Sequence, residues 1–239
     1  MTVAVGERPA VEPRTRTRTR TQSRWPRRLR IAALAVLAAT IGALLQGNLA
    51  LIAASWWARS NTELDAGPKL EGVRKLYVVD DRLWRGAQPG LTGFRSLAES
   101  GVTTVIDLRP STDARKVDGE LRALGMESIH LPVTDGTPPS PSQVRQVVDI
   151  VDNSQGRVFL HCGEGVGRAG TMSAAYKVTT GKASASEALR ESLAIGVLTL
   201  EQIAFIRSLD RDGAHDPPVV ATAVSRFLDG PRQLFNTLV

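Results

Sequence analysis

The chain has 239 residues, which is enough for one domain of ordinary size and a terminal extension. Its formal net charge is +6. Residues 1–30 hold nine arginines and two glutamates, so this segment carries +7 and the rest of the chain carries −1. Because the excess charge lies in one tail, the composition excludes a basic nucleic-acid-binding domain, and we expect no nucleic-acid partner. The single cysteine, Cys162, excludes an intramolecular disulfide and a cysteine-rich metal site.

The first 30 residues lack the apolar positions that a packed core needs. Arginine alternates with threonine from Thr15 to Thr21, and prolines occur on both sides of this run. Such a composition cannot bury enough apolar surface to offset the loss of chain entropy on folding. We therefore predict that residues 1–30 are a disordered, arginine-rich tail.

Residues 31–58 form an uncharged, mostly apolar segment that ends beside Trp56 and Trp57. A helix of this length exceeds the roughly 30 Å hydrocarbon core of a bilayer, and tryptophans are typical of the membrane interface. A buried core helix is disfavoured because nearly every face is apolar. We predict a single transmembrane helix, and the positive-inside rule then places the N-terminus in the cytoplasm and the chain after Arg59 outside it.

A cleaved signal peptide is the alternative interpretation of this N-terminal region. It would share the basic start and the apolar run that follows. The run is, however, longer than the usual apolar region of a signal peptide, and we find no clear small-residue cleavage site. An uncleaved anchor is therefore favoured.

Strand and helix patterns alternate along residues 75–212, after a linker over residues 59–74. A strand–turn–strand unit is predicted at 76–89, and further strands at 102–108, 128–133 and 158–160. Helices are predicted at 91–100, 113–124, 140–153, 186–193 and 200–209. A further helix is predicted to begin at Ala169 and to cover residues 171–180. The alternation indicates an α/β fold with a central, mostly parallel sheet flanked by helices, which places ligands at the C-terminal strand ends.

Residues 213–239 form a C-terminal extension. Two adjacent prolines break the chain, and apolar residues then recur at helical spacing from Val220 to Phe227. We predict an amphipathic helix over residues 219–228. It packs on the domain or lies on the membrane surface, and the sequence leaves both possibilities open.

The segment from Val158 to Thr171 combines a short apolar run, a glycine-rich turn and the start of a helix. Such a turn directs backbone N–H groups and the positive end of a helix dipole to one point, which favours an anion. Cys162 lies at the floor of the turn, where a helix N-terminus and a nearby cation favour the nucleophilic thiolate. Arg168 follows six positions later, and its planar guanidinium matches two oxygens of a phosphate.

Three other kinds of site share parts of this pattern. Residues 165–170 fit the dinucleotide fingerprint G-x-G-x-x-G, but the acidic strand end expected about 20 residues further on is replaced by a predicted helix. A P-loop NTPase needs Gly-Lys-Ser/Thr, and this loop has no lysine. A buried, inert cysteine would leave His161 and Arg168 without a role.

The spacing His-Cys-x5-Arg, formed by His161, Cys162 and Arg168, resembles the cysteine-dependent protein phosphatases of the tyrosine and dual-specificity class. Gly165, Gly170 and Thr171 also match. The family implies a dual-specificity-phosphatase-like fold and hydrolysis of a phosphomonoester through a phosphocysteine intermediate, with no metal and no cofactor.

Two upstream segments are similar to bacterial, membrane-anchored members of the same class. These segments are Leu-Trp-Arg-Gly-Ala-Gln-Pro at 83–89 and Val-Ile-Asp-Leu-Arg at 105–109. The resemblance therefore runs from about Leu76 to Leu209. Within these segments, the recurrent family positions are Arg85, Gln88, Asp107 and Arg109. We interpret the last two as a strand-end ion pair.

The resemblance implies a role for each residue of the loop. Cys162 attacks phosphorus, Arg168 binds the phosphate oxygens, and His161 and Thr171 support the loop. The phosphate-binding backbone is supplied by Gly163, Glu164, Gly165, Val166, Gly167 and Arg168. Gln202 lies where some relatives place a glutamine that orients water, but we expect it on a solvated helix face.

A phosphatase also needs a general acid, which protonates the leaving oxygen and later activates water. The family supplies an aspartate from a loop upstream of the cysteine. Asp135 lies in a Gly/Pro-containing loop, 27 residues before Cys162, and is our candidate. A structural turn residue is the alternative role for it, and Asp113 and Asp118 are the alternative acids.

Ala169 departs from the family pattern, which usually has Ser or Thr directly after the arginine, where the hydroxyl helps the sulfur leave. A phosphate-binding pseudophosphatase is therefore an alternative. The implied substrate is a phosphorylated protein, on Tyr or on Ser/Thr. A phosphorylated lipid head group is the second possibility because the predicted anchor holds the site near a bilayer. Lipid-type relatives often carry lysines in the loop, whereas this loop has Glu164 and Val166, which favours a protein.

Overall fold

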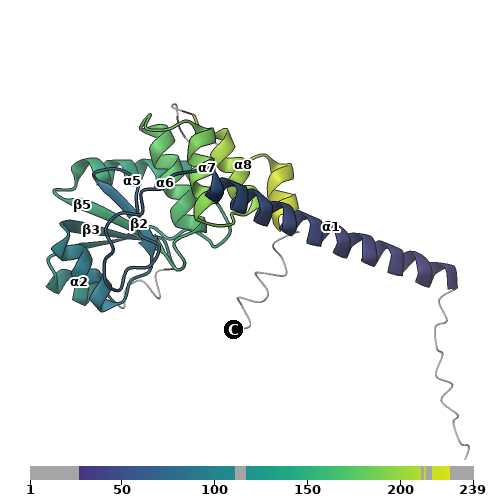
Figure 1. Cartoon of the computed structure of the whole chain (residues 1–239), viewed down its shortest axis with the longest axis horizontal. Helices are drawn as coiled ribbons and strands as arrows, with labels where there is room; N and C mark the ends of the chain where they lie inside the picture. Colours follow the sequence, from purple (N-terminus) through teal and green to yellow (C-terminus); the bar gives the residue numbers. More distant parts are fainter. Residues whose placement is uncertain (1–26, 111–116, 211–212, 214–216, 227–239) are drawn as a thin grey trace, which may run out of the picture. The chain divides into compact units, whose positions relative to one another are not determined.

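The computed structural model describes residues 27–110, 117–210, 213 and 217–226. The chain divides into two compact units, Met1–Gly42 and Ala43–Val239. In the first unit the described residues form the start of helix α1 (Arg27–Ser60). The second unit contains the remainder of α1 and the whole α/β domain (Figure 1).

Helix α1 is 34 residues long and is apolar enough to cross a membrane, with a mean hydropathy of 1.9 over its most apolar stretch. None of that stretch is buried. The helix begins at Arg27 rather than at Ile31, so the last residues of the predicted disordered tail are helical. Residues 1–26 of that tail lie outside the described residues.

Five strands form one sheet in the order β1-β2-β5-β3-β4. β5 runs parallel to β2 and β3, and β4 runs parallel to β3, whereas β1 is antiparallel to β2. The central strand β5 therefore brings its last residue, Cys162, to the middle of the C-terminal edge of the sheet. The predicted α/β fold with a mostly parallel sheet is confirmed. The strand bounds are β1 Tyr77–Val78, β2 Leu83–Ala87, β3 Val102–Asp107, β4 Glu127–His130 and β5 Arg157–Cys162.

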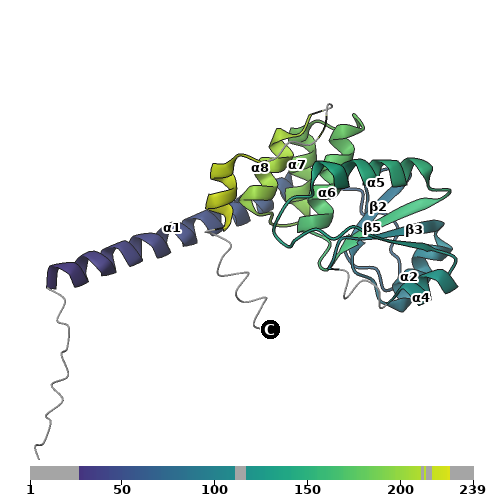
Figure 2. The same ribbon diagram turned by 180° about the vertical axis from the view of Figure 1, so that it is seen from behind.

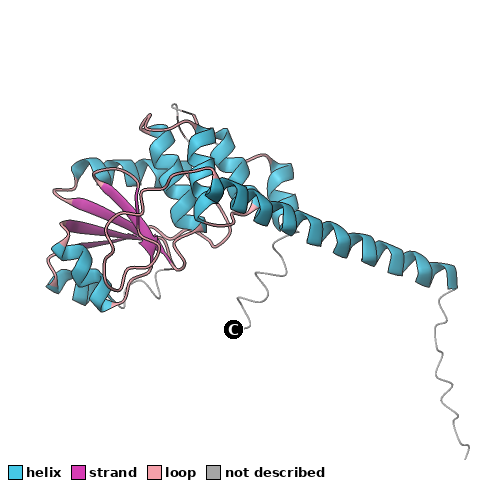
Figure 3. Ribbon diagram, in the orientation of Figure 1, coloured by secondary structure: helices cyan, strands magenta, loops and turns pink. Residues whose placement is uncertain are grey.

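Helices cover both faces of the sheet (Figures 2 and 3). One face carries α2 (Leu91–Glu99) and α4 (Asp118–Ala123), and the other carries α5 (Pro141–Asn153) and α6 (Gly167–Thr179). Two further helices, α7 (Ala185–Ile195) and α8 (Leu200–Ser208), pack against α6.

The side chains of β5 alternate between these two layers. Phe159 belongs to the core under α2 and α4, whereas Val158 and Leu160 belong to the core under α5 and α6. A strand that is buried on both faces has no solvent side, and this explains the continuous apolar run that precedes His161.

Local sequence signals explain where several helices start. The side chains of Ser140, Ser184 and Thr199 each accept a hydrogen bond from the backbone of the third helical residue in a capping box. Strand β4 ends at His130, earlier than predicted. Helix α4 (Asp118–Ala123) lies within the helix predicted over residues 113–124. Residues 113–116 of that predicted helix lie outside the described residues.

The C-terminal extension is helical over residues 219–226, and residues 227–228 of the predicted helix are not among those described. Its contact with the domain is polar, because the buried Ser225 hydroxyl accepts a hydrogen bond from the Glu201 N–H at 3.1 Å. Val219 and Val220 are 84% and 74% exposed. These two valines therefore take no part in the core of the domain.

The last turns of α1 belong to the packed body of the second unit. Ala58 is fully buried, and the Ser55 hydroxyl donates to the Leu193 carbonyl at 2.7 Å. Arg59 donates to the carbonyls of Ala194 and Ile195 at 3.1 and 3.4 Å. The final carbonyls of a helix lack intrahelical donors, so Arg59 caps the C-terminus of α7 from another element.

We expect Arg59→Ala to lower the free energy of unfolding by about 1 kcal/mol, because two carbonyls at the end of α7 lose a charged donor. The measurement is urea unfolding of the full chain in detergent micelles. Arg95→Ala, which removes an exposed arginine of α2, is the matched control. Equal stability losses in the two variants would contradict a capping role for Arg59.

Candidate active site

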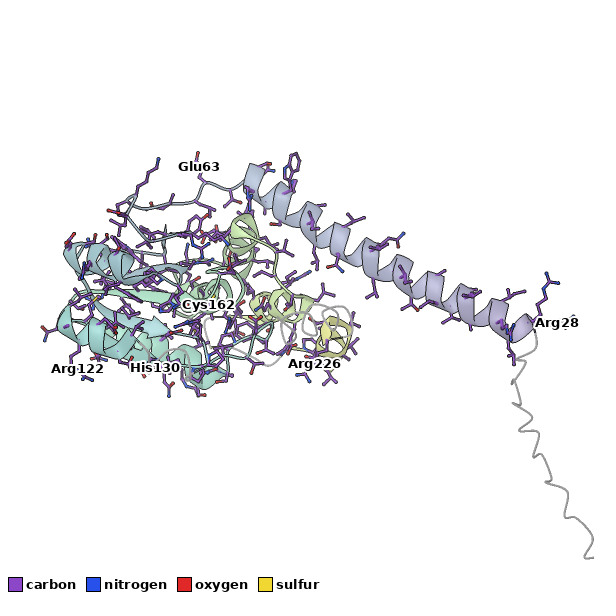
Figure 4. The ribbon with its side chains drawn as sticks, turned by 90° about the horizontal axis from the view of Figure 1, so that it is seen from below. Arg28, Glu63, Arg122, His130, Cys162 and Arg226 are labelled. Carbon is purple, nitrogen blue, oxygen red and sulfur yellow. The ribbon has the colours of Figure 1, made fainter. Side chains whose placement is uncertain are left out.

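Cys162 is the last residue of β5 and is only 3% exposed. Figure 4 labels it within the body of the domain. Its sulfur accepts a hydrogen bond from the Gly165 N–H, with the donor nitrogen 3.3 Å from Sγ. The chain therefore turns back over Cys162 within three residues, and a backbone N–H points at the sulfur.

This turn is possible because residue 165 has no side chain. Gly165 has a φ of +72°, a conformation that L side chains rarely adopt. A Cβ at this position would lie 2.4 Å from the Ala87 nitrogen and 2.5 Å from the Gly86 carbonyl carbon. The Gln88 N–H also donates to the Gly163 carbonyl at 3.0 Å. The loop is thus held against the C-terminal end of β2.

Helix α6 begins at Gly167, two residues earlier than the predicted start at Ala169. Arg168 consequently lies in its first turn, where helix N–H groups have no intrahelical acceptors and the dipole is positive. The five phosphate-binding candidates before Arg168 span the turn from Cys162 into this helix. The arrangement can hold an anion directly above the sulfur.

The structure brings Asp135 to the same place. The Arg168 Nε lies 3.1 Å from the Asp135 Oδ1, although its N–H is not aligned for a hydrogen bond. The Asp135 side chain is 67% exposed, whereas that of Arg168 is 12% exposed. A carboxyl group from the loop after β4 is therefore next to the guanidinium of Arg168, the last residue of the segment 163–168, which we call the phosphate loop after its predicted role.

Helix α8 holds the loop that carries Asp135. The Thr199 hydroxyl donates to the Gly136 carbonyl at 2.8 Å, and the Gln202 Nε2 donates to the Thr137 carbonyl at 3.4 Å. Gln202 is 1% exposed and also packs against Gly167. The predicted solvated position of Gln202 is wrong, because its capping box turns the side chain towards the start of α8, beside the loop.

His161 is buried under the loop and holds the Cys162 backbone. Its Nδ1 lies 3.2 Å from the Cys162 carbonyl oxygen, and its ring stacks on Phe159 with centroids 5.8 Å apart. Burial lowers the pKa of His161, and the nearby Asp107 carboxylate only partly opposes this. His161 is therefore neutral at pH 7, and only one of its two ring nitrogens carries a proton that it can donate.

Asp107 and Arg109 form the ion pair expected from the sequence. The Arg109 Nη2 lies 2.7 Å from the Asp107 Oδ2, and the Arg109 Nη1 donates to the Gln88 Oε1. Burial raises the pKa of Asp107, but its hydrogen bonds from Arg109 outweigh this, so the pKa lies below its ordinary 3.8. The pair ties the end of β3 to the segment that supports Gly163.

The remaining candidates have other partners in the structure. The Thr171 hydroxyl donates to the Gly167 carbonyl of its own helix at 2.8 Å. Asp118 accepts from the Ser128 hydroxyl and lies 2.9 Å from the His130 Nε2, so it interacts with β4. Asp113 lies outside the described residues.

Two residues of the loop bear on turnover and substrate choice. Ala169 is fully buried, and because it is an alanine the position after Arg168 carries no hydroxyl. Glu164 is 72% exposed at the side chain and pairs with Lys75 at 3.2 Å. The sequence did not predict that Arg85 supports the loop. In the structure this buried residue lies behind the loop and donates a hydrogen bond to the Gly165 carbonyl.

A family model described as "DSP-PTPase phosphatase fused to NAD+ Kinase" matches residues 73–208. The chain belongs to this phosphatase family. The match contains all five strands, the phosphate loop and Asp135. It therefore identifies the α/β domain as a cysteine-dependent phosphatase domain of the dual-specificity class.

Curated relatives match over shorter stretches. Probable NAD kinase 2, chloroplastic, of Oryza sativa subsp. japonica is 35% identical over 101 residues, which are 39% of this chain and 10% of that protein. Dual specificity protein phosphatase CDC14A of Mus musculus is 32% identical over 83 residues, 35% of this chain and 13% of that protein. The matches thus span about a tenth of the length of these relatives.

Solved structures show the same fold. A mutant form of Tk-PTP has a TM-score of 0.51 at 24% identity, covering 57% of this chain and 95% of its own. PTPMT1 in complex with PI(5)P has a TM-score of 0.50 at 23% identity, covering 55% and 92%. P. aeruginosa TpbA has a TM-score of 0.50 at 23% identity, covering 57% and 86%.

Proposed function

We propose that the protein hydrolyses phosphomonoesters through a phosphocysteine, with Cys162 as nucleophile, Arg168 as phosphate ligand and Asp135 as general acid and base. The observation that carries this assignment is the 3.1 Å contact between Arg168 and Asp135. It places an acid from a separate loop beside the guanidinium that faces the same anion site. A nucleophile, an anion site and a proton donor are then within reach of one substrate.

In the first step the Cys162 thiolate forms a bond to phosphorus, and the bond from phosphorus to the leaving oxygen breaks. Arg168 and the loop N–H groups bind the three phosphoryl oxygens and stabilise their negative charge. Asp135, in its protonated form, transfers its proton to the leaving oxygen, so that an alcohol departs rather than an alkoxide.

In the second step water attacks the phosphocysteine. The Asp135 carboxylate takes a proton from this water, the sulfur–phosphorus bond breaks, and inorganic phosphate and the Cys162 thiolate are released. Gln202 is buried between the Asp135 loop and Gly167, where its amide accepts from the Thr199 N–H and donates to the Thr137 carbonyl, so its role is to hold the Asp135 loop. The enzyme returns to its starting protonation state without a metal or cofactor.

We expect Cys162→Ser to abolish phosphate release and Asp135→Asn to reduce kcat/KM by about 100-fold or more, because the leaving oxygen loses its proton donor. The loss of kcat/KM in Asp135→Asn is larger for phenyl phosphate than for p-nitrophenyl phosphate, whose leaving group needs less protonation. Steady-state hydrolysis by the full chain in micelles measures both. Asp149→Asn, on the exposed side of α5, is the control. An equal loss for both substrates would contradict the assignment of Asp135.

Ala169 bears on the second step. The sulfur has the Gly165 N–H as a donor, and residue 169 offers no hydroxyl to stabilise the departing thiolate. The first step is unaffected by this difference, since the anion site and Asp135 are in place. We therefore infer that hydrolysis of the phosphocysteine limits the overall rate.

Rapid mixing with p-nitrophenyl phosphate should show a burst of about one nitrophenolate per enzyme, followed by slow turnover. Ala169→Ser should raise the slow rate by about 10-fold, corresponding to about 1.4 kcal/mol. Ala169→Gly, which changes the residue without adding a hydroxyl, is the matched control. Turnover without a burst would contradict a rate-limiting second step, and phosphate binding without any release of nitrophenolate would indicate a pseudophosphatase.

For the substrate we propose a phosphorylated protein located outside the cytoplasmic membrane. The exposed carboxylate of Glu164 places negative charge beside the loop, and this disfavours a head group with several phosphates. The location rests on α1, whose arginine-rich N-terminal flank favours the cytoplasmic side. A phosphorylated lipid is the second candidate, because α1 would hold the domain close to a bilayer.

Intact spheroplasts that express the full chain should release phosphate from an added phosphotyrosine peptide that cannot cross membranes. Cells that express Cys162→Ser should not. Hydrolysis that appears only after lysis would refute the proposed orientation. Phosphate release by the detergent-solubilised protein from a phosphatidylinositol phosphate in vesicles, without release from the peptide, would show that the substrate is a lipid.

A further inference from the structure

We propose that Arg85 is a positioning residue of the phosphate loop, which from behind the loop fixes Gly165 so that its N–H faces the sulfur of Cys162. The inference rests on the proposed function, because it assigns a role within the same site. Arg85 lies in the middle of β2, a strand that contributes none of the residues assigned to bind phosphate or transfer protons.

The contacts form a short chain from Arg85 to the nucleophile. The Arg85 Nη2 donates to the Gly165 carbonyl at 3.0 Å. The N–H of the same residue, Gly165, donates to the Cys162 Sγ at 3.3 Å. Gly165 has a positive φ, and its backbone also lies against Gly86 and Ala87. The guanidinium restrains the peptide group that follows Gly165, and together with this contact it keeps the Gly165 N–H directed at the sulfur.

The guanidinium is held from its other side by α6. Its Nη1 donates to the Ser173 hydroxyl at 2.9 Å, and Ser173 in turn donates to the Gly170 carbonyl at 3.0 Å. A Cβ on Gly170 would lie 3.2 Å from the Arg85 Nη1. The glycine at 170 thus leaves the space that the guanidinium occupies, and the hydrogen bonds to Gly165 and Ser173 define its position.

Burying a charged guanidinium costs desolvation free energy, which argues against a role that only fills space in the core. Arg85 is 3% exposed, and its buried Nε has no hydrogen-bond partner in the structure. Burial lowers the pKa of Arg85 to about 10, and Cys162, Tyr77 and Glu191 oppose this shift. Arg85 therefore remains a cation at pH 7. A buried cation on the far side of the loop from Arg168 stabilises negative charge on the sulfur.

Arg82 offers a matched comparison within the same chain. Its guanidinium also joins separate elements through backbone carbonyls, donating to Val151 at 2.7 and 3.1 Å and also to Ser154. These carbonyls belong to the end of α5 and the residue after it, and not to the phosphate loop. If Arg85 were only a structural bridge, substitutions at 82 and 85 would have the same kinds of effect.

The test measures the rate of alkylation of Cys162 by iodoacetamide against pH, using the full chain in micelles, alongside kcat and KM for p-nitrophenyl phosphate. In Arg85→Gln the pH of half-maximal alkylation should rise by about 1 unit, and kcat should fall about 10-fold. Arg85→Lys, which keeps the charge but loses the two-armed contact, should restore most of the alkylation profile. Arg82→Gln should lower only the thermal midpoint.

An alkylation profile of folded Arg85→Gln that matches the wild type would overturn the proposal. Should Arg85→Gln not fold, Ser173→Ala removes the second anchor of the guanidinium at a small structural cost. It should move the profile in the same direction by a smaller amount, and an unchanged profile in Ser173→Ala would then overturn the proposal. Alkylation needs no substrate, so an inactive wild type would refute the proposed function without deciding the role of Arg85.

Discussion

The close approach of the phosphate loop to the end of β2 is the constraint on which the site depends. Gly165 lies so near the backbone of Gly86 and Ala87 that no side chain fits there. This contact directs the Gly165 N–H towards Cys162 and places the Gly165 carbonyl within reach of the guanidinium of Arg85. Strand pairing supplies the frame, because β2 and β5 are parallel neighbours whose C-terminal ends meet.

The site is assembled from elements that are far apart in the chain. β5 supplies Cys162, the proposed nucleophile, and the loop after β4 supplies Asp135. The start of α8 holds that loop through Thr199 and Gln202. The end of α1 reaches the same body of the domain by capping α7 with Arg59. The apolar N-terminal helix therefore ends as part of the folded domain.

The sequence was sufficient for the fold and for the residues close together in the chain. Apolar runs bounded by glycines indicated the strands, and the fixed spacing of Cys162, Gly165 and Arg168 indicated the anion site. It was less successful at element ends, because β4 stops at His130 and α6 starts at Gly167. Strand pairing and loop packing decide these ends, and local residue preferences reflect them only in part.

By itself the sequence determined the α/β class, the apolar N-terminal helix and the chemistry of the loop, because these depend on periodicity, composition and short spacings. Only the tertiary structure decided the contact of Asp135 with Arg168, the burial of Gln202 and the position of Arg85 behind Gly165. Each of these joins segments separated by tens of residues. Such contacts follow from the order in which the strands pair and the faces on which the helices pack, which no local pattern records.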